Sequence, residues 1–121
     1  MVERYPEGLE KILPYLTQKF GLPVYITEHG ASSMDESFRD RDLHSYLSRL
    51  HNAIAAGADV RGFFYWSLLD NFEWTFGYSK KFGLLSVDFD DERLPRKMKP
   101  LGEIYRSICQ RNYVEMPANR G

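Results

Sequence analysis

Residues 60–74, which read VRGFFYWSLLDNFEW, decide the fold predicted for this chain. The run from Val60 to Leu69 is strongly apolar and contains one charged residue, Arg61. A strand with one face in solvent would carry polar side chains at alternate positions, so this run predicts a strand that is buried on both faces. Polar residues begin at Asp70, directly after the predicted strand.

An earlier segment repeats this arrangement. Residues 24–27 read VYIT, and their β-branched content predicts a short buried strand of a parallel sheet. The polar sequence Glu28-His29-Gly30 closes that strand. Both predicted strands therefore carry polar side chains at their carboxyl ends.

Helices are predicted before, between and after the two strands. Apolar residues recur at helical spacing from Leu9 to Phe20 and stop before Gly21. Pro14 interrupts this pattern and costs about 3 kcal/mol in a helix interior, so the first helix is expected to be kinked or to begin late. Pro100 opens the last amphipathic helix.

The middle helix follows a polar segment, residues 31–41. Asp40 or Asp42 is the expected N-cap, because a carboxylate at that position accepts hydrogen bonds from free backbone N–H groups. Gly57 stands where a left-handed residue ends a helix. The apolar face of the helix recurs at helical spacing and comprises Leu43, Tyr46, Leu47, Leu50 and Ile54.

The order of helix, strand, helix, strand and helix predicts an α/β fold. Right-handed crossovers would make the two strands parallel neighbours. Two strands alone leave open sheet edges, so the pattern calls for more sheet than this chain provides. Polar residues at the carboxyl ends of parallel strands form the active face of a (β/α)8 barrel, also called a TIM barrel. The chain is therefore predicted to be one part of such a barrel.

Composition narrows the classes of partner. The 121 residues include 16 basic and 17 acidic ones, and the net charge of −1 favours neither nucleic acid nor an anionic membrane. No apolar run approaches the roughly 20 residues that span a bilayer, and residues 1–4 lack the apolar region of a secretory signal. Cys109 is the single cysteine, so a reducing, cytoplasmic environment is the expectation.

The residues at the predicted strand ends suit a carbohydrate. Apolar faces of a sugar ring stack on aromatic side chains such as Trp66 and Trp74, while a carboxylate such as Glu28 accepts hydrogen bonds from hydroxyl groups. The same residues also permit a second interpretation, in which Glu28 forms a structural salt bridge and the aromatic residues form a packed core. The pattern alone leaves both open.

Residues 23–30 (PVYITEHG), 59–74 (DVRGFFYWSLLDNFEW) and 77–84 (GYSKKFGL) form three ordered blocks. Together they resemble family 1 of the glycoside hydrolases, which are retaining β-glucosidases and β-galactosidases. The resemblance covers nearly the whole chain. It implies that residues 1–113 are the C-terminal portion of a single (β/α)8 domain, containing strands seven and eight, and that residues 114–121 are a flexible tail.

The resemblance implies a role for each candidate site residue. Glu28 corresponds to the nucleophile, which attacks the anomeric carbon while a second carboxylic acid about 5–5.5 Å away protonates the leaving oxygen. Glu73 and Trp74 would bind hydroxyl groups of the non-reducing sugar, Trp66 would stack on the sugar, and Phe82 would line the pocket. Neither a cofactor nor a metal is expected.

The sequence also departs from the family. The family's acid/base glutamate lies in an Asn-Glu-Pro motif, which is absent here. A (β/α)8 barrel needs about 250 residues, so the acid/base and the N-terminal remainder of the barrel are expected to come from elsewhere, and the chain alone is expected to be inactive. His29 replaces an asparagine of the family and is interpreted as a tolerated neighbour. Glu73 and Phe82 favour a neutral sugar over a 6-phosphorylated one.

The predicted function is hydrolysis of terminal β-D-glycosides, in the manner of a β-glucosidase, by double displacement with retention. Its partners would be a small β-glycoside and the remainder of the barrel. One alternative is a non-catalytic relative that binds a glycan or a protein, which an upstream sequence without the acid/base glutamate would favour. Another is a small self-sufficient α/β domain that a homodimer completes.

Overall fold

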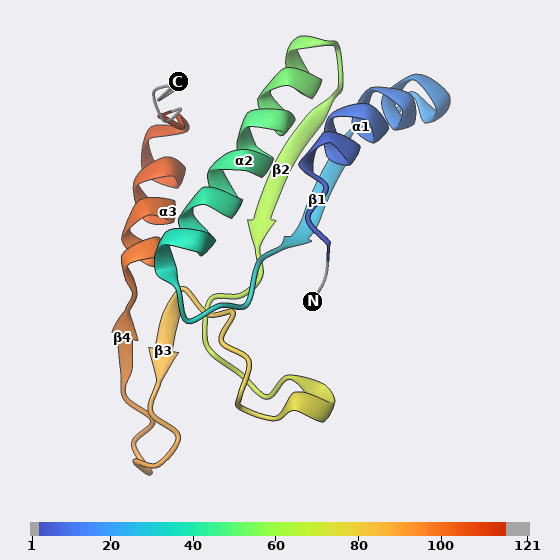
Figure 1. The fold of residues 1–121 in the computed structure, drawn as a ribbon. Coiled ribbons are helices and arrows are strands. Elements are labelled where there is room, and N and C mark those ends of the chain that lie inside the picture. The colour runs from blue at the N-terminus through green and yellow to red at the C-terminus, as the bar shows by residue number, and fades with distance from the viewer. Residues whose placement is uncertain (1–2, 116–121) are drawn as a thin grey trace.

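The computed structural model describes residues 3–115, and its elements follow the predicted order (Figure 1). Helices and strands alternate through the first half of the chain, and a short hairpin precedes the last helix. The elements are α1 (Pro6–Phe20), β1 (Val24–His29), α2 (Glu36–Ala55), β2 (Val60–Tyr65), the 3-10 helix η1 (Trp74–Phe76), β3 (Leu85–Val87), β4 (Arg96–Met98) and α3 (Pro100–Arg111).

Strands β1 and β2 form a parallel two-stranded sheet, which confirms the prediction of parallel neighbours. Val24 pairs with Val60 at the start of the sheet. The register shifts after Val24 and again between Ile26 and His29, each time by an irregularity of the β-bulge kind. Figure 1 shows both arrows pointing the same way, with α1 and α2 alongside them.

The hydrophobic core lies between the helices and one face of this sheet. Its buried residues come from all three helices and from two loops, and they are Leu13, Leu43, Leu47, Leu50, Ala53, Ala58, Leu84 and Leu101. Ile26 and Phe63 pack against them from the sheet. Helical apolar stripes and alternate strand residues thus meet in one layer.

The other face of the sheet is open within residues 3–115. Tyr25 is 54% exposed and Phe64 is 56% exposed. The predictions that β2 is buried on both faces and that β1 is a buried strand are therefore wrong for this chain, because the helices cover one face only. The rings of Tyr25 and Phe64 lie close together, since a Cβ added to Gly62 would stand 2.5 Å from Cδ1 of Tyr25 and 3.2 Å from Cε2 of Phe64.

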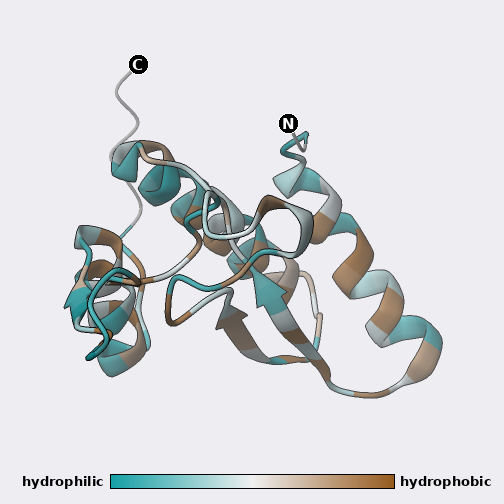
Figure 2. Cartoon of the chain, turned by 90° about the horizontal axis from the view of Figure 1, so that it is seen from below, coloured by the Kyte–Doolittle hydropathy of each residue, from teal (hydrophilic) through white to brown (hydrophobic). Residues whose placement is uncertain are grey.

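Helix α1 begins at Pro6 and includes Pro14, so the expectation that it begins late is wrong. Pro6 stands in the first turn, where a residue without an N–H group breaks no helical hydrogen bond. Gly21 ends the helix in the left-handed conformation, with φ of 63°, as predicted. Seen from below, α1 carries alternating apolar and polar bands (Figure 2).

Helix α2 begins earlier than predicted. Its N-cap is Asp35, whose carboxylate accepts hydrogen bonds from the backbone N–H groups of Ser37 and Phe38, and neither Asp40 nor Asp42 has that role. Both of those residues lie within the helix. The polar loop before the helix already ends at residue 35, so Asp35 is the carboxylate that meets the free backbone N–H groups of the first turn. Gly57 follows the helix with a positive φ of 100°, as the sequence predicted.

The second strand is shorter than predicted and ends at Tyr65. The peptide bond between Trp66 and Ser67 is cis, and Leu69 forms an isolated parallel bridge with Leu85. An antiparallel hairpin of β3 and β4 follows, and sequence analysis missed its second strand. Within residues 3–115, no helix is both long and apolar enough to cross a membrane.

Candidate functional site

The carboxyl ends of β1 and β2 bring Glu28 and Trp66 to the same end of the sheet. His29 pairs with Tyr65 in the register of the two strands, and the backbone N–H of Trp66 donates to the carbonyl oxygen of His29 at 2.8 Å. Glu28 and Trp66 each stand one position from this closing pair. Both side chains are exposed, and Trp66 is 38% exposed.

The register shift at the end of β1 determines to which side of the sheet the last residues of the strand point. Ile26 packs against the core, and the ring of His29 contacts that of Tyr46 in α2, with centroids 4.0 Å apart. Both residues lie on the helix side although they are three positions apart, whereas side chains of a regular strand return to one face every two residues. The irregularity between Ile26 and His29 supplies the extra residue, and Thr27 and Glu28 are both exposed.

Glu73 and Trp74 lie on the loop that carries η1. The backbone N–H of Glu73 donates to the carbonyl oxygen of Gly77 at 2.7 Å, which closes a tight turn. Trp74 is 84% exposed, while Glu73 is partly buried. Figure 1 shows this loop at the end of the molecule toward which β1 and β2 point. Within residues 3–115, no hydrogen bond or ion pair joins either side chain to Glu28.

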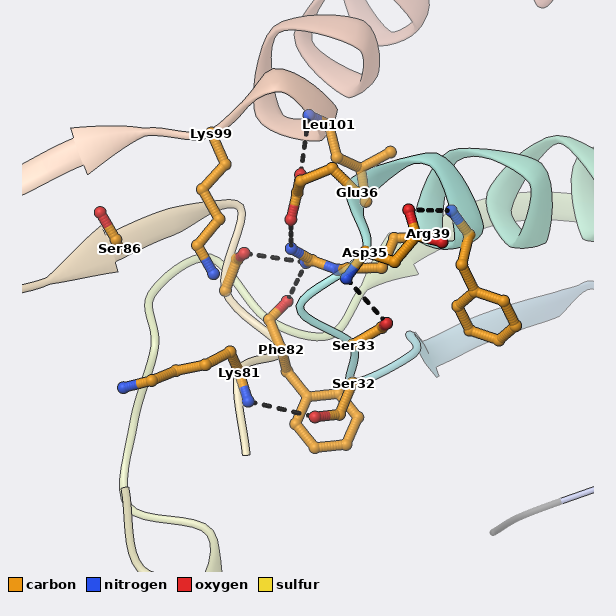
Figure 3. A network of polar contacts seen from close by, with 12 residues as sticks. Ser32, Ser33, Asp35, Glu36, Arg39, Lys81, Phe82, Ser86, Lys99 and Leu101 are labelled. Carbon is orange, nitrogen blue, oxygen red and sulfur yellow. Dashed lines mark hydrogen bonds and ion pairs between the residues drawn. The ribbon is translucent and has the colours of Figure 1, made fainter. Parts of the chain in front are cut away.

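Buried charges hold the segment that carries Phe82. The Arg39 side chain is completely buried, and its Nη2 donates to the carbonyl oxygens of Phe82 and Gly83 at 2.6 and 2.8 Å. Oδ1 of Asp70 accepts the N–H of Gly83 at 2.9 Å and pairs with Nζ of Lys99 at 2.8 Å. Figure 3 shows the Arg39 guanidinium beside the Phe82 carbonyl. Gly83 is thus bonded to buried charges through both its N–H and its C=O groups.

The ion pair of Arg39 and Glu36 also joins three elements of secondary structure. Nη1 of Arg39 pairs with Oε1 of Glu36 in the first turn of α2, and Nη2 donates to the hydroxyl of Tyr65 at 3.3 Å. The second oxygen of Glu36 accepts the backbone N–H of Leu101 at 3.3 Å, in the first turn of α3. The start of α2, the start of α3 and the end of β2 are therefore linked through the Arg39–Glu36 pair.

A second polar network lies behind β1. Nε2 of His29 is 3.1 Å from Oδ2 of Asp42, and Oδ1 of Asp42 accepts a hydrogen bond from Nε of Arg4. Asp42 is 3% exposed. Burial by itself would raise the pKa of the Asp42 carboxyl, but the hydrogen bonds and charges of His29 and Arg4 outweigh that effect and hold its pKa below the ordinary value.

The site combines two carboxylates, of which Glu28 is exposed and Glu73 partly buried, with exposed indole rings. Within residues 3–115, no hydrogen bond or ion pair engages the carboxylates of Glu28 and Glu73, so both are available to accept hydrogen bonds from a ligand. Trp66 and Trp74 offer apolar ring surfaces beside them. In the same range, no group of three or more His, Cys, Asp and Glu side chains is arranged to hold a metal ion. The arrangement is typical of a site for a polyhydroxylated ligand.

The sequence model of Glycosyl hydrolase family 1 matches residues 1–114. The chain belongs to glycosyl hydrolase family 1. This membership confirms the family inferred from the three sequence blocks. The helix–strand units agree with those of the solved family 1 structures to which the chain is similar, as expected for a part of their barrel.

Relatives of this family 1 chain are glycosidases by name. It is 40% identical over 112 residues to a β-galactosidase of Sulfolobus acidocaldarius, which is 93% of this chain and 22% of that protein. It superimposes on a β-glycosidase from Pyrococcus horikoshii with a TM-score of 0.84 and 35% identity, over 92% of this chain and 26% of that one. For a β-glucosidase from Thermotoga maritima in complex with glucoimidazole, the TM-score is 0.82 and the identity 34%, over 94% of this chain and 30% of that one. The chain thus spans about a quarter of the length of these relatives.

Sequence analysis of this family 1 chain missed the three buried charges that support the site. Arg39, Asp42 and Asp70 are each at most 4% exposed. One signal was available for Arg39, since it lies four residues before Leu43 and so continues the apolar stripe of α2. A charged side chain on such a stripe is rarely buried unless it is paired.

Proposed function

We propose that this chain forms part of a retaining β-glycosidase that hydrolyses terminal β-D-glycosides, with Glu28 as its nucleophile. One observation carries the proposal. In a chain of family 1, Glu28 is an exposed carboxylate at the carboxyl end of a parallel strand, one position from the pair that also positions Trp66. The carboxyl ends of parallel strands are where (β/α)8 enzymes carry their catalytic groups.

In the proposed mechanism, Glu28 attacks the anomeric carbon and the bond to the leaving oxygen breaks. A carboxylic acid on another part of the barrel, about 5–5.5 Å away, protonates that oxygen. Water then hydrolyses the glycosyl-enzyme ester, with the same acid now acting as a base. The chemistry needs no cofactor.

The sugar is proposed to bind against the aromatic side chains of the same end. Trp66 stacks on an apolar ring face, while Glu73 and Trp74 bind hydroxyl groups and Phe82 lines the pocket. The buried bonds from Arg39 to the Phe82 carbonyl support this assignment, because they hold the segment in one place. A neutral sugar is proposed, since the Glu73 carboxylate would repel a phosphorylated one. The glucoimidazole complex of the Thermotoga maritima relative is consistent with a neutral glycoside.

The proposed active enzyme is a complete barrel, in which this chain supplies strands seven and eight. The open sheet face and the two-stranded sheet support the proposal, because further strands would pair with the free edges and cover Tyr25 and Phe64. The N-terminal remainder would also supply the acid/base. The chain by itself is expected to be inactive.

Trapping of the intermediate tests the proposal. The complete barrel, made by joining this chain to an upstream part with the acid/base glutamate, is incubated with a 2-deoxy-2-fluoro β-glucoside and then digested for peptide mapping. Label is expected on Glu28 and is expected to disappear in Glu28→Gln. The matched variant Glu73→Gln is expected to bind more weakly and still to acquire label on Glu28. Label on another residue would overturn the assignment, and binding without any label would favour a non-catalytic relative.

A further inference from the structure

His29 is a departure from the family that the proposed mechanism does not use. It follows Glu28 directly, and the register shift turns its ring away from the open end of the sheet and onto α2. The ring lies 4.0 Å from that of Tyr46 and 5.7 Å from that of Phe63, measured between centroids. Its side chain is 16% exposed. His29 is thus built into the layer between sheet and helix.

The chemistry of the neighbouring groups assigns the proton between His29 and Asp42. Arg4 and His29 hold the pKa of Asp42 low, so its carboxyl is ionised at neutral pH. An ionised carboxylate can only accept a hydrogen bond. Nε2 of His29, 3.1 Å from Oδ2, must therefore carry the proton and donate it. The contact is a charge-assisted hydrogen bond to a buried acceptor, which is stronger than a neutral one.

The groups around the His29–Asp42 contact leave the His29 side chain one direction in which to bond, toward helix α2. Asp42 is the acceptor in α2, and Arg4 occupies its other oxygen. The hydroxyl of Tyr46 accepts the backbone N–H of Tyr5. Glu28, the neighbour of His29 in β1, is exposed. His29 therefore bonds toward the helix with its side chain, and its backbone carbonyl bonds across the sheet to the N–H of Trp66.

We propose that His29 is a positioning residue, which holds Glu28 and Trp66 in place by fastening the end of β1 to Asp42 of α2. The inference rests on the proposed role of Glu28. Within residues 3–115 the Glu28 carboxylate has no bonded partner, so its direction is set by the backbone that carries it. The His29–Asp42 hydrogen bond fixes that backbone on one side, and the His29–Trp66 hydrogen bond fixes it on the other.

The hydrogen bond is tested without any activity measurement. Nitrogen-detected NMR of the 121-residue chain at pH 7.5 is expected to show a proton on Nε2 of His29 that exchanges slowly with water. In Asp42→Leu, its exchange is expected to be at least about tenfold faster, because the charged acceptor is gone. Asp40→Leu is the matched control, since Asp40 pairs with His44, one turn further along α2. Loss of the Asp40 carboxylate should leave the exchange rate of the His29 proton unchanged. An unprotonated Nε2 in the unaltered chain, or rapid exchange like that of the exposed His51, would overturn the proposal.

The positioning role is tested on the complete barrel. The rate constant for labelling of Glu28 by the 2-deoxy-2-fluoro β-glucoside is expected to fall about 10- to 100-fold in His29→Leu, with little change in the concentration that half-saturates labelling. His29→Gln places a donor near the position of Nε2 and is expected to restore the rate to within about threefold. Equal rates in the unaltered barrel and His29→Leu, or failure of Gln where the protein is folded, would overturn the role of His29. Absence of label in the unaltered barrel would instead refute the proposed function.

Discussion

Asp42 links two distant parts of the chain, because Arg4 and His29 both bond to its carboxylate. Its pKa in the folded chain lies below the ordinary value of 3.8. A lowered pKa means that the ionised carboxylate stabilises the fold above about pH 4 and that this contribution is lost as the pH falls through the folded pKa. The network therefore makes the fold sensitive to acid rather than to base.

The substitution Asp42→Asn tests whether this one carboxylate makes the fold sensitive to acid. Between pH 7 and pH 3, urea unfolding should show a larger loss of unfolding free energy in the unaltered chain than in Asp42→Asn, which cannot titrate at that position. Asp59→Asn is a suitable control, because Asp59 pairs with Arg61 on the exposed surface, where ion pairs contribute little. Equal losses in the unaltered chain and Asp42→Asn would contradict the prediction.

Gly83 is required for a close approach of two backbone segments. A Cβ at this position would stand 2.2 Å from the backbone nitrogen of Asp70 and 2.4 Å from the carbonyl oxygen of Leu85. Neither backbone atom can move alone, so Gly83→Ala is expected to lower the free energy of unfolding by about 3 kcal/mol. Gly21→Ala is the control, since it meets open space and carries only the penalty of a left-handed φ, about 1 kcal/mol. Thermal or urea unfolding measures both, and a smaller loss for Gly83→Ala than for Gly21→Ala contradicts the prediction.

At the scale of elements, helix α2 is the part that connects the site to the rest of the fold. It carries Arg39 under the Phe82 segment and Asp42 under the end of β1. Its N-terminal residue Glu36 reaches the first turn of α3. Both supports of the predicted sugar site thus lie within one turn of the same helix.

Arg39→Met is expected to destabilise the fold strongly. It would leave the Glu36 carboxylate and the carbonyl oxygens of Phe82 and Gly83 without their buried donor. Loss of one partner from a buried charged network costs about 3–5 kcal/mol. Arg41→Met, on the same helix but with a side chain that is 64% exposed, should change the free energy of unfolding by less than about 0.5 kcal/mol. Similar unfolding midpoints for the two variants would show that Arg39 is not the support described above.

At the scale of the whole molecule, the two-stranded sheet has both edges free and one face open among residues 3–115. The open face carries Tyr25 and Phe64, and Trp66 follows directly after β2; each of these residues is more than a third exposed. Large exposed apolar surface beside unpaired strand edges is typical of an interface that is not yet covered. This supports the proposal that further strands complete the sheet.

Hydrogen exchange on the 121-residue chain examines that proposal. Amides of β1 and β2 that face the free edges are expected to exchange quickly in the chain alone and at least about tenfold more slowly in the complete barrel, where neighbouring strands accept their hydrogen bonds. Helix α2 serves as the internal reference, because its amides bond within the helix in both proteins. Sedimentation checks the assembly state. A compact monomer with protected strand edges would contradict the need for a complement, and a protected dimer would support the self-sufficient domain.

Local patterns made most of the architecture predictable. Helical spacing of apolar residues, a run of β-branched residues and single glycines or prolines at the ends act over a few neighbouring positions, so α1, α2, α3 and the parallel strands followed from them. The same patterns set Glu28 at a strand end, whereas Trp66 was predicted inside a strand that runs to Leu69 and follows the end of β2 only in the structure. The N-cap was missed because Asp35, Asp40 and Asp42 have equal capping chemistry, and only the real start of the helix distinguishes them. Strand β4 was missed because three residues show no periodicity.

The sequence by itself determined the family, the order of the elements and the end of the sheet on which the candidate catalytic residue lies. Only the tertiary structure decided that Arg39, Asp42 and Asp70 are buried, that His29 faces the helix and that one face of the sheet is open. The physical reason is the distance along the sequence over which each effect acts. Helix and strand propensities depend on neighbours in the sequence, whereas the burial of a charge and the direction of a ring depend on what another segment, some 13 to 44 residues away, brings against it.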